Sequence, residues 1–525
     1  MRVAVADVGT NSSHLLIAEA LNPAAQSAPA GEGRAEVGGY RVLDALKDRT
    51  RLGECLDAAG NLTPEGEERL AAALTHFQAL GAAAGVPDVQ VYATSALREA
   101  PNGEAVAARI RERTGIYPVI ISGEREGQLT YLGAAHSVDF GPDNLLLDLG
   151  GGSLELARGG PEQAQDVLSV PLGAIRMTRA HLHHDPPTKA EVRAVQDAVR
   201  AALAPHAARF RVQPGTHVVL SSGTAEAAAA LIAAQGDSVP GSVNGLSLTT
   251  ADLGALLERT RSLSAARRTR LPGLERRADT VVAGLAVLHA ALETLGATRA
   301  TVSEGALREG MLIEELGRHA AYAAGLSARQ RSVLGAAERF GANLAHARHV
   351  TALARDLLTR LEEAGEASAP EARSLLTAAA GLHEVGQIVA QSSHHKHGAY
   401  LIRHAGLRGF SPREIELVAQ LARYHRKSGP KLSHPEYAAL STPDRTLVAR
   451  LAAVLRVADG LDRSHAGQVR LLALTRSPSG WTLALSGANP LDLAGARDKA
   501  DLWAREFGPL TLKAEQPGEE AMLGA

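Results

Sequence analysis

The sequence predicts an α/β first half, followed by a mainly α-helical second half with a small strand-containing tail. Short apolar strands alternate with helical segments as far as about Gly310. A pattern of strand, Asp, polar turn and strand occurs at Asp7 and again at Asp148, which indicates that the α/β half is duplicated. Beyond Gly310 the chain is rich in long Ala-, Leu- and Arg-containing segments with few strand signals.

The length of 525 residues corresponds to three or four domains at roughly 150 residues each. We expect four segments, 1–126, 127–318, 319–468 and 469–525. Hydrophobic residues make up 45% of the chain but aromatic residues only 3%, so the cores must consist largely of Ala, Leu and Val.

The charge balance limits the partners that the chain can have. Lys and Arg number 55 against 57 acidic residues, a net charge of -2, which argues against binding nucleic acid through overall charge. No apolar run reaches the roughly 18 residues of a membrane helix, so we expect no membrane span. The single cysteine, Cys55, cannot form an internal disulfide, and we expect a cytoplasmic protein.

In the first repeat, apolar runs predict strands over 3–6, 15–18, 89–93 and 116–121. The Ala-, Pro- and Gly-rich stretch 22–39 predicts a loop. Thr63 is the expected N-cap of a helix that begins at Pro64. Further helices are expected to begin near Thr94 and Ser122.

In the second repeat, strands are expected over 145–147 and 154–156, on either side of the Asp148 turn. The strand at 218–220 leads through Ser222-Gly223-Thr224 into a helix over 225–234, which resembles the 91–98 segment of the first repeat. Near the end of the chain, strands are expected over 469–475 and 481–485.

Two carboxylates stand where a strand enters a turn of small residues. Asp7 precedes Val8-Gly9-Thr10-Asn11-Ser12, and Asp148 precedes Leu149-Gly150-Gly151-Gly152-Ser153. Such a carboxylate can hold a metal ion or orient water, while uncovered backbone N–H groups bind phosphate oxygens. Either aspartate alone is equally well explained by hydrogen bonds within its turn. Two such turns at matching places favour a phosphate held between the repeats.

The next candidates lie at predicted helix starts. Ser95 and Arg98 are one helical turn apart, so the Arg98 guanidinium can bind a phosphate together with N–H donors of the helix N-terminus. The alternative for Arg98 is an exposed arginine on an amphipathic helix. Glu124 and Glu126 both fall in the first turn of the next helix, and the sequence does not distinguish them.

Six segments together resemble the exopolyphosphatase/guanosine pentaphosphate phosphatase family. They are Asp7-Val8-Gly9-Thr10-Asn11-Ser12, Ala93-Thr94-Ser95-Ala96-Leu97-Arg98, Ile121-Ser122-Gly123-Glu124-Arg125-Glu126-Gly127, Asp148-Leu149-Gly150-Gly151-Gly152-Ser153-Leu154-Glu155, Val170-Pro171-Leu172-Gly173-Ala174-Ile175-Arg176 and Ser303-Glu304-Gly305-Ala306-Leu307-Arg308-Glu309-Gly310. The resemblance covers residues 1 to about 318 in order and continues into the helical half.

The resemblance implies an actin-like fold of two ribonuclease-H-like domains, with the active site in the cleft between them. It places the general base at Glu126, with Asp148 and Glu155 completing an acidic cluster around a divalent metal ion, usually Mg²⁺. Asp7 is expected to help place the metal or water. The expected phosphate-binding residues are Asn11, Ser12, Ser95, Arg98, Gly151, Gly152 and Ser153. Ser222-Gly223-Thr224 departs from the more Gly-rich form of the family and is left out of the site, and a homodimer is expected for a long member.

The helical half contains nine of the 20 histidines between His346 and His434. His346, His383-Glu384 and Asp459 resemble the skeleton of an HD domain, whose metal is normally held by a His, a His–Asp pair and a distant Asp. Here Glu384 replaces the aspartate and moves the donor oxygen by one methylene. This change favours a degenerate domain over a second catalytic centre.

A basic run in the same half is the last candidate. Its cations are Arg403, Arg408, Arg413, Arg423, Arg426, Lys427 and Lys431, with only Glu414 and Glu416 opposing them in the same span. Charge runs usually mark a solvated face. In a slightly acidic protein, a local concentration also suits a long anion, and we predict that Arg426, Lys427 and Lys431 bind the distal part of a polyphosphate chain.

The leading functional hypothesis is therefore an exopolyphosphatase that releases orthophosphate from chain ends. A pppGpp 5′-phosphohydrolase is the first alternative, because both substrates present the same terminal phosphates. An actin-like kinase or ATPase would transfer phosphate to an acceptor other than water. A non-enzymatic phosphate or alarmone sensor would gain nothing from Glu126, Asp148 and Glu155 facing an anion.

Overall fold

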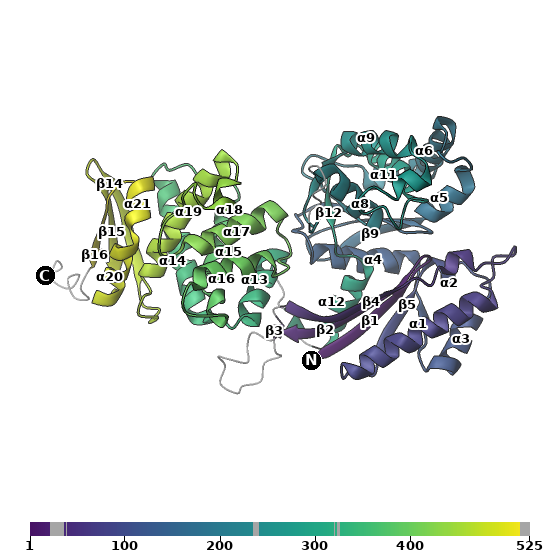
Figure 1. The fold of residues 1–525 in the computed structure, drawn as a ribbon, viewed down its shortest axis with the longest axis horizontal. Coiled ribbons are helices and arrows are strands. Elements are labelled where there is room, and N and C mark those ends of the chain that lie inside the picture. Colours follow the sequence, from purple (N-terminus) through teal and green to yellow (C-terminus); the bar gives the residue numbers. More distant parts are fainter. Residues whose placement is uncertain (22–35, 38, 235–240, 320, 323–325, 515–525) are drawn as a thin grey trace. The chain divides into compact units, whose positions relative to one another are not determined.

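The computed structural model describes residues 1–21, 36–37, 39–234, 241–319, 321–322 and 326–514. The chain forms two compact units (Figure 1). Unit 1 comprises Met1–Ala328 and Arg408–Pro412, and unit 2 comprises Arg329–Leu407 and Arg413–Ala525. The finer division into four segments remains a prediction.

Unit 1 contains two mixed β-sheets with the same topology. The first has the order β4-β2-β1-β5-β6, in which β1, β2 and β4 are antiparallel neighbours and β5 and β6 continue parallel to β1. The second has the matching order β9-β8-β7-β10-β12, with β11 added at the edge. This match confirms the predicted duplication and the actin-like arrangement of two ribonuclease-H-like domains.

The strands of the first sheet are β1 (Arg2–Val8), β2 (Ser13–Leu21), β4 (Gly39–Asp48), β5 (Val89–Ala93) and β6 (Val119–Ile120). Those of the second are β7 (Asn144–Leu149), β8 (Leu154–Gly159), β9 (Ala164–Val170), β10 (His217–Ser221), β11 (Ser247–Thr249) and β12 (Arg299–Ser303). β3 (Glu36–Val37) pairs with β13 (Ala321–Tyr322).

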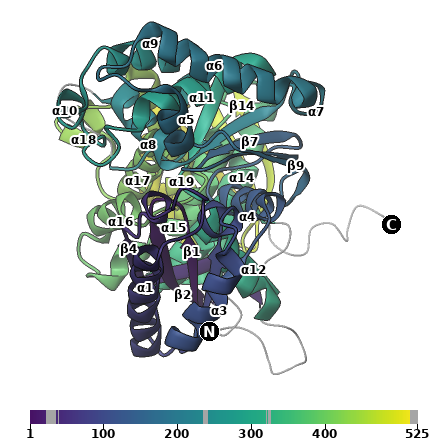
Figure 2. The same ribbon diagram turned by 90° about the vertical axis from the view of Figure 1, so that its right-hand side faces the viewer.

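Helices cover the outer face of each sheet. On the first sheet these are α1 (Pro64–Ala83) and α3 (Gly103–Thr114), whose apolar side chains join the strands in one core. On the second sheet they are α6 (Lys189–Leu203), α8 (Gly223–Ala233), α9 (Thr250–Arg261) and α11 (Val281–Leu295), seen above β7 and β9 in Figure 2. The predicted cap of α1 is confirmed, because Thr63 Oγ1 accepts a hydrogen bond from the Gly66 N–H at 3.3 Å.

Two further helices, α4 (Gly123–Ala135) and α12 (Leu307–His319), pack on the remaining faces and against each other. Glycines allow their close approach, since a Cβ atom at Gly310 would lie 1.8 Å from the Leu129 carbonyl oxygen, and one at Gly133 would lie 2.1 Å from that of Ala306. The N-terminal turn of α4 carries Glu126. This tight packing therefore fixes the position of Glu126 relative to both sheets.

Three local predictions need correction. The strand expected over 116–121 is reduced to the two residues of β6, since Pro118 lacks the N–H that a sheet partner needs. The helix expected near Thr94 is the single turn α2 (Ser95–Arg98). Most of the loop expected over 22–39 lies outside the described residues, but Glu36–Val37 form β3 and Gly39 begins β4.

Unit 2 is mainly helical and ends in a three-stranded sheet. Its long helices α14 (Leu344–Glu363), α15 (Ala372–Leu382), α17 (Pro412–Tyr424) and α19 (Thr442–Gly460) are accompanied by α13 (Ala328–Arg339), α16 (His394–Arg403) and α18 (Pro435–Ala438). The sheet joins β14 (Arg470–Ser477), β15 (Gly480–Ser486) and β16 (Leu510–Ala514), with α20 (Pro490–Lys499) and α21 (Asp501–Glu506) between the last two strands. The two predicted tail strands are confirmed as β14 and β15. No helix within the described ranges has the length and apolar character to cross a membrane.

Candidate active site

The two predicted turns have the same backbone structure. At the end of β1 the Gly9 N–H donates to the Ser12 carbonyl oxygen at 3.1 Å, and at the end of β7 the Gly150 N–H donates to that of Ser153 at 3.0 Å. The second turn is further held by α5 (Ala174–His181), whose first N–H groups donate to the carbonyl oxygens of Gly150 and Gly151. The duplicated sequence pattern therefore produces duplicated geometry.

The two turns also face each other. Thr10 Oγ1 of the first turn donates to Ser95 Oγ at 3.4 Å. A Cβ atom at Gly152 of the second turn would lie 1.9 Å from the same Ser95 Oγ, and one at Gly151 would lie 3.3 Å from Thr10 Cβ. Because Gly151 and Gly152 of the second turn have no side chains, the two turns and the start of α2 can pack closely together.

Acidic side chains gather beside these turns and raise one another's pKa values. Burial and the nearby Glu126 carboxylate raise the pKa of Asp148 to about 7. Burial, together with the Glu126 and Asp148 carboxylates, raises the pKa of Glu155 well above its usual range. The pKa of Glu126 is also raised, mainly by burial and less by Asp7, although Arg98 opposes the shift.

The acidic cluster of Asp7, Glu126, Asp148 and Glu155 fits a hard divalent cation. Glu155 Oε1 accepts a hydrogen bond from Ser169 Oγ at 2.7 Å, but its buried Oε2 has no hydrogen-bond partner among the described residues. A cation supplies such an oxygen with a partner and relieves the repulsion that raises the pKa values.

The predicted metal ligands Asp7, Asp148 and Glu155 do not form a compact three-carboxylate group. Among the described residues, the only groups of three potential ligands with donor atoms within 4.8 Å of one another lie in unit 2. Mg²⁺ does not require such a group, because it is typically held by one or two carboxylates together with water and substrate phosphates.

Glu126 and Arg98 form a partly buried ion pair. Arg98 Nη1 donates to Glu126 Oε2 at 2.8 Å and to the Ile121 carbonyl oxygen at 3.1 Å. Glu124, by contrast, is exposed on the same helix. The structure therefore separates the two glutamates that the sequence left equivalent, and it brings Arg98 to the acidic cluster.

His14 is a site residue that the sequence interpretation missed. Its Nδ1 lies 3.1 Å from Asp7 Oδ2, and its Nε2 lies 3.1 Å from Ser12 Oγ. The signal was available in the register, because a tight turn between antiparallel strands places His14 directly opposite Asp7. His14 thus connects the carboxylate of the first turn to its last hydroxyl group.

Three basic residues near the same region were also missed as candidates. Burial and the neighbouring Arg277 lower the pKa of Lys47 on β4. Arg308 also lowers this pKa, whereas Asp7 raises it. Arg277 packs against the Ser222-Gly223-Thr224 turn, since a Cβ atom at Gly223 would overlap its guanidinium. Arg308 lies within a motif that carried the resemblance, but its charge was given no role.

In unit 2, the basic run is more neutralised than its sequence suggested. Arg403 pairs with Glu416, Arg413 with Asp444 and Glu371, and Arg423 with Glu436. Three of these acids, Glu371, Asp444 and Glu436, lie outside the span in which the sequence shows only Glu414 and Glu416, so the net charge of the run is lower than the span alone suggests. The predicted Lys427 and Lys431 are exposed, and Arg426 Nη1 lies 3.1 Å from His394 Nδ1.

Comparisons with known proteins agree with this architecture. Residues 34–319 match the model of the Ppx/GppA phosphatase family, and residues 328–492 match that of Ppx/GppA phosphatase, domain III. Exopolyphosphatase 1 of Mycobacterium tuberculosis is 32% identical over 320 residues, which are 60% of this chain and 88% of the relative. A guanosine-5′-triphosphate,3′-diphosphate pyrophosphatase of Photobacterium profundum is 28% identical over 98% of both chains.

Solved structures give a similar result for part of the chain. The Aquifex aeolicus member of the Ppx/GppA family matches with a TM-score of 0.51 and 27% identity, over 61% of this chain and 98% of its own. An exopolyphosphatase from Cytophaga hutchinsonii matches in fold with a TM-score of 0.53 and 24% identity, over 62% of this chain and 100% of its own.

Proposed function

Because the chain belongs to the Ppx/GppA phosphatase family, we propose that it is an exopolyphosphatase that releases orthophosphate from the ends of inorganic polyphosphate. The observation that carries this proposal is the pair of facing turns with the acidic cluster beside them. The turns supply backbone and hydroxyl donors for a terminal phosphate, and the cluster supplies a base.

In the proposed reaction, a water molecule attacks the terminal phosphorus in line with the bridging oxygen. The P–O bond to that oxygen breaks, orthophosphate leaves, and the chain is one phosphate shorter. The carboxylate of Glu126 orients the water and accepts its proton, a role for which burial and neighbouring carboxylates prepare it by raising its pKa. Arg98, now paired with Glu126, can bind a phosphate oxygen with the other nitrogen of its planar guanidinium.

The proposed cation is Mg²⁺ or another divalent ion, held by Asp148 and Glu155 with help from Asp7. When bound, it neutralises charge on the phosphate oxygens and thereby favours attack by an anionic or polarised nucleophile. His14 holds Asp7 in place, and the facing turns of Asn11-Ser12 and Gly151-Gly152-Ser153 position the terminal phosphate.

A second candidate function is hydrolysis of pppGpp. One observation favours it: the Photobacterium profundum pyrophosphatase is similar over 98% of both chains, including unit 2, whereas the Mycobacterium tuberculosis exopolyphosphatase is similar over only 60% of this chain. The same residues would carry the chemistry, because the reacting group is again a terminal phosphoanhydride.

Parallel assays of orthophosphate release from long-chain polyphosphate and from pppGpp test the two candidates. A higher kcat/KM for polyphosphate supports the first proposal, and a higher value for pppGpp supports the second. Release from neither substrate contradicts both. Hydrolysis in ¹⁸O-labelled water separates both from an actin-like kinase, because only attack by water places the label in orthophosphate.

A further inference from the structure

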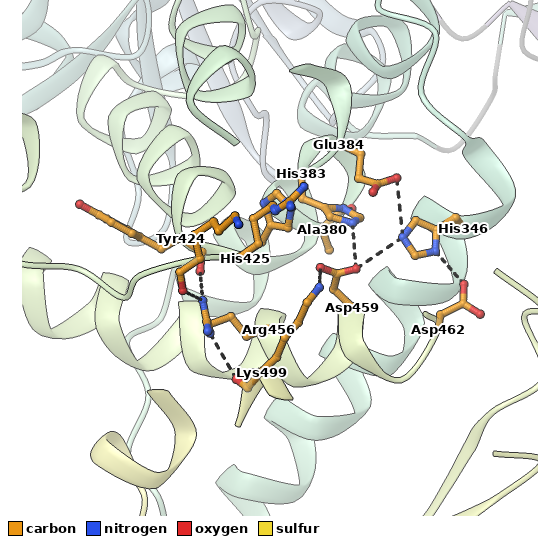
Figure 3. A network of polar contacts seen from close by, with 12 residues as sticks. His346, Ala380, His383, Glu384, Tyr424, His425, Arg456, Asp459, Asp462 and Lys499 are labelled. Atoms are coloured by element: carbon orange, nitrogen blue, oxygen red, sulfur yellow. Dashed lines mark hydrogen bonds and ion pairs between the residues drawn. The ribbon is translucent and has the colours of Figure 1, made fainter. Parts of the chain in front are cut away.

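Three buried side chains from three regions of unit 2, those of His346, His383 and Asp459, bring their donor atoms together, and the partly buried Glu384 lies beside His346 (Figure 3). His346 lies on α14, His383 and Glu384 directly follow α15, and Asp459 lies near the end of α19. His346 is 2% exposed, His383 1% and Asp459 6%. Groups so thoroughly removed from water need partners, because burial of an unpaired polar group is costly.

The hydrogen bonds of the two imidazoles fix which nitrogen is free to act as a ligand. His383 Nδ1 lies 2.8 Å from the Ala380 carbonyl oxygen, which can only accept, so Nδ1 carries the proton. His346 Nδ1 lies 2.8 Å from Asp462 Oδ2, while the other oxygen of Asp462 accepts from the Gly467 N–H at 2.9 Å. In each ring the Nε2 atom then presents a lone pair to the interior, and both Nε2 atoms lack a hydrogen-bond partner within the described chain.

The spacing of these atoms is that of ligands around one ion. Asp459 Oδ1 lies 3.6 Å from the Nε2 atoms of both His346 and His383, and Glu384 Oε2 lies 3.8 Å from His346 Nε2. These distances are too long for hydrogen bonds. Ligands bound tetrahedrally at about 2.1 Å lie about 3.4 Å from one another, close to the observed spacing.

The charges around the cluster also call for a cation. Asp459 uses its other oxygen, Oδ2, to pair with Lys499 Nζ from α20, which leaves Oδ1 directed at the imidazoles. The carboxylates of Asp459, Glu384 and Asp462 outnumber the single ammonium of Lys499. With both imidazoles neutral, two negative charges remain, which one divalent ion balances.

We propose that unit 2 binds one divalent transition-metal ion, with Zn²⁺ as the best match, through His346 Nε2, His383 Nε2 and the carboxylate of Asp459. Two imidazole donors favour Zn²⁺ over Mg²⁺, which prefers oxygen ligands. Glu384 Oε2 lies 3.8 Å from His346 Nε2, but Glu384 does not belong to the group formed by His346, His383 and Asp459. Three protein donors leave one position of a tetrahedral ion to water, and the ion would join α14, the end of α15 and α19.

The inference is tested on the full-length chain by measuring bound Zn²⁺ after removal of metals, incubation with Zn²⁺ and dialysis. Excess Mg²⁺ is kept present to occupy oxygen-rich sites. We expect one equivalent of Zn²⁺ in the unchanged protein, none in His346→Gln and His383→Gln, and one in the control His404→Gln, an exposed histidine of unit 2. Circular dichroism verifies that each variant is folded, and Zn²⁺ should raise the melting temperature only of proteins that bind it.

Equal Zn²⁺ content in the unchanged protein and in His383→Gln would overturn the inference. The variant Lys499→Met provides a second test of the metal site. If Lys499 only holds Asp459, this variant keeps the site with Zn²⁺ affinity reduced about 10- to 100-fold. If the unchanged protein binds no Zn²⁺ but Lys499→Met does, the lysine itself is the resident cation and the proposal is wrong. None of these readouts depends on phosphatase activity.

Discussion

Glu126 has the surroundings of a general base, and its replacement by glutamine should abolish most of the activity. It is buried, paired with Arg98 at 2.8 Å, and its pKa is raised mainly by burial. Glu126→Gln removes the proton acceptor while retaining the size of the side chain, so we expect kcat to fall about 10²- to 10⁴-fold with substrate affinity preserved. Steady-state kinetics and substrate binding to the variant measure the two quantities.

Glu124→Gln is the matched control, because Glu124 is exposed and lies in the same helical turn as Glu126. It should retain full activity. Full turnover in Glu126→Gln, or an equal loss in both variants, would show that Glu126 is not the base.

The raised pKa of Asp148 predicts how cation binding depends on pH. Burial, followed by the Glu126 carboxylate, raises its pKa from 3.8 to about 7. Between these values the metal-free native state holds a proton that the unfolded state has lost, so its stability should decrease as the pH rises through this interval. A cation must displace the same proton, and Mg²⁺ affinity should therefore increase with pH up to about 7.

Calorimetric titration of Mg²⁺ in buffers of different ionisation enthalpy measures this coupling. We expect more proton release at about pH 6 than at about pH 8, and Asp148→Asn should reduce the difference. Mg²⁺ binding that is independent of pH across this range would contradict the role of Asp148.

At the residue level, the sequence predicted those site residues that mark a turn. Asp7, Asp148 and the glycines after them could be identified because turns have local sequence rules. Lys47 and Arg277 could not, since their position depends on contacts between distant segments, whereas His14 could have been found from the register of β1 and β2. The choice between Glu124 and Glu126 likewise required knowledge of which one is buried.

The contact between α4 and α12 holds Glu126 in position, and its glycines should be sensitive to substitution. Gly310→Ala would place a Cβ atom 1.8 Å from the Leu129 carbonyl oxygen, which is backbone and cannot move aside. We expect destabilisation of about 1–3 kcal/mol, seen as a lower melting temperature.

Gly317→Ala, on the exposed face of the same helix, provides the control. A Cβ atom there meets no heavy atom within 4 Å, so alanine should stabilise α12 by about 0.5–1 kcal/mol. Equal melting temperatures for the two variants would contradict close packing of α12 against α4.

At the level of elements, strands and helices with local signals were predicted well. The strand at 89–93 coincides with β5, and the cap at Thr63 with the start of α1. β6 was predicted too long because its apolar run contains Pro118, whose effect on pairing outweighs hydrophobicity. β16 (Leu510–Ala514) was missed, although its sequence alternates between apolar and polar residues as that of a half-buried strand does.

At the level of the whole molecule, we propose that Arg426 and the exposed Lys427 and Lys431 of unit 2 retain a long substrate between cleavage steps. Arg426, Lys427 and Lys431 are not paired with the acids that neutralise Arg403, Arg413 and Arg423. Replacing all three by Ala should change processive shortening of polyphosphate into distributive shortening, because distal phosphate contacts are lost.

Gel analysis of the product lengths at partial digestion separates the two modes. Arg348→Ala with Arg355→Ala, two exposed cations on α14, removes two positive charges elsewhere in unit 2 and serves as the control. Unchanged processivity in the triple variant would remove the proposed role of this surface. A homodimer, which the family resemblance led us to expect, remains a prediction for measurements of mass in solution.

The duplication and the class of each half were predictable from sequence patterns that span the chain. The residues of the proposed metal site in unit 2 were recognised from the sequence, but their arrangement was not. Whether Glu384 reaches His346 depends on the packing of α14 against α15, which no local pattern specifies.

The most direct test is a crystal structure of Glu126→Gln with Mg²⁺ and a short polyphosphate. We expect the terminal phosphate between the Gly9–Ser12 and Gly150–Ser153 turns, with a water molecule between its phosphorus and the side chain at position 126. A terminal phosphate bound away from both turns, or a residue 126 too far to contact the attacking water, would contradict the proposed reaction.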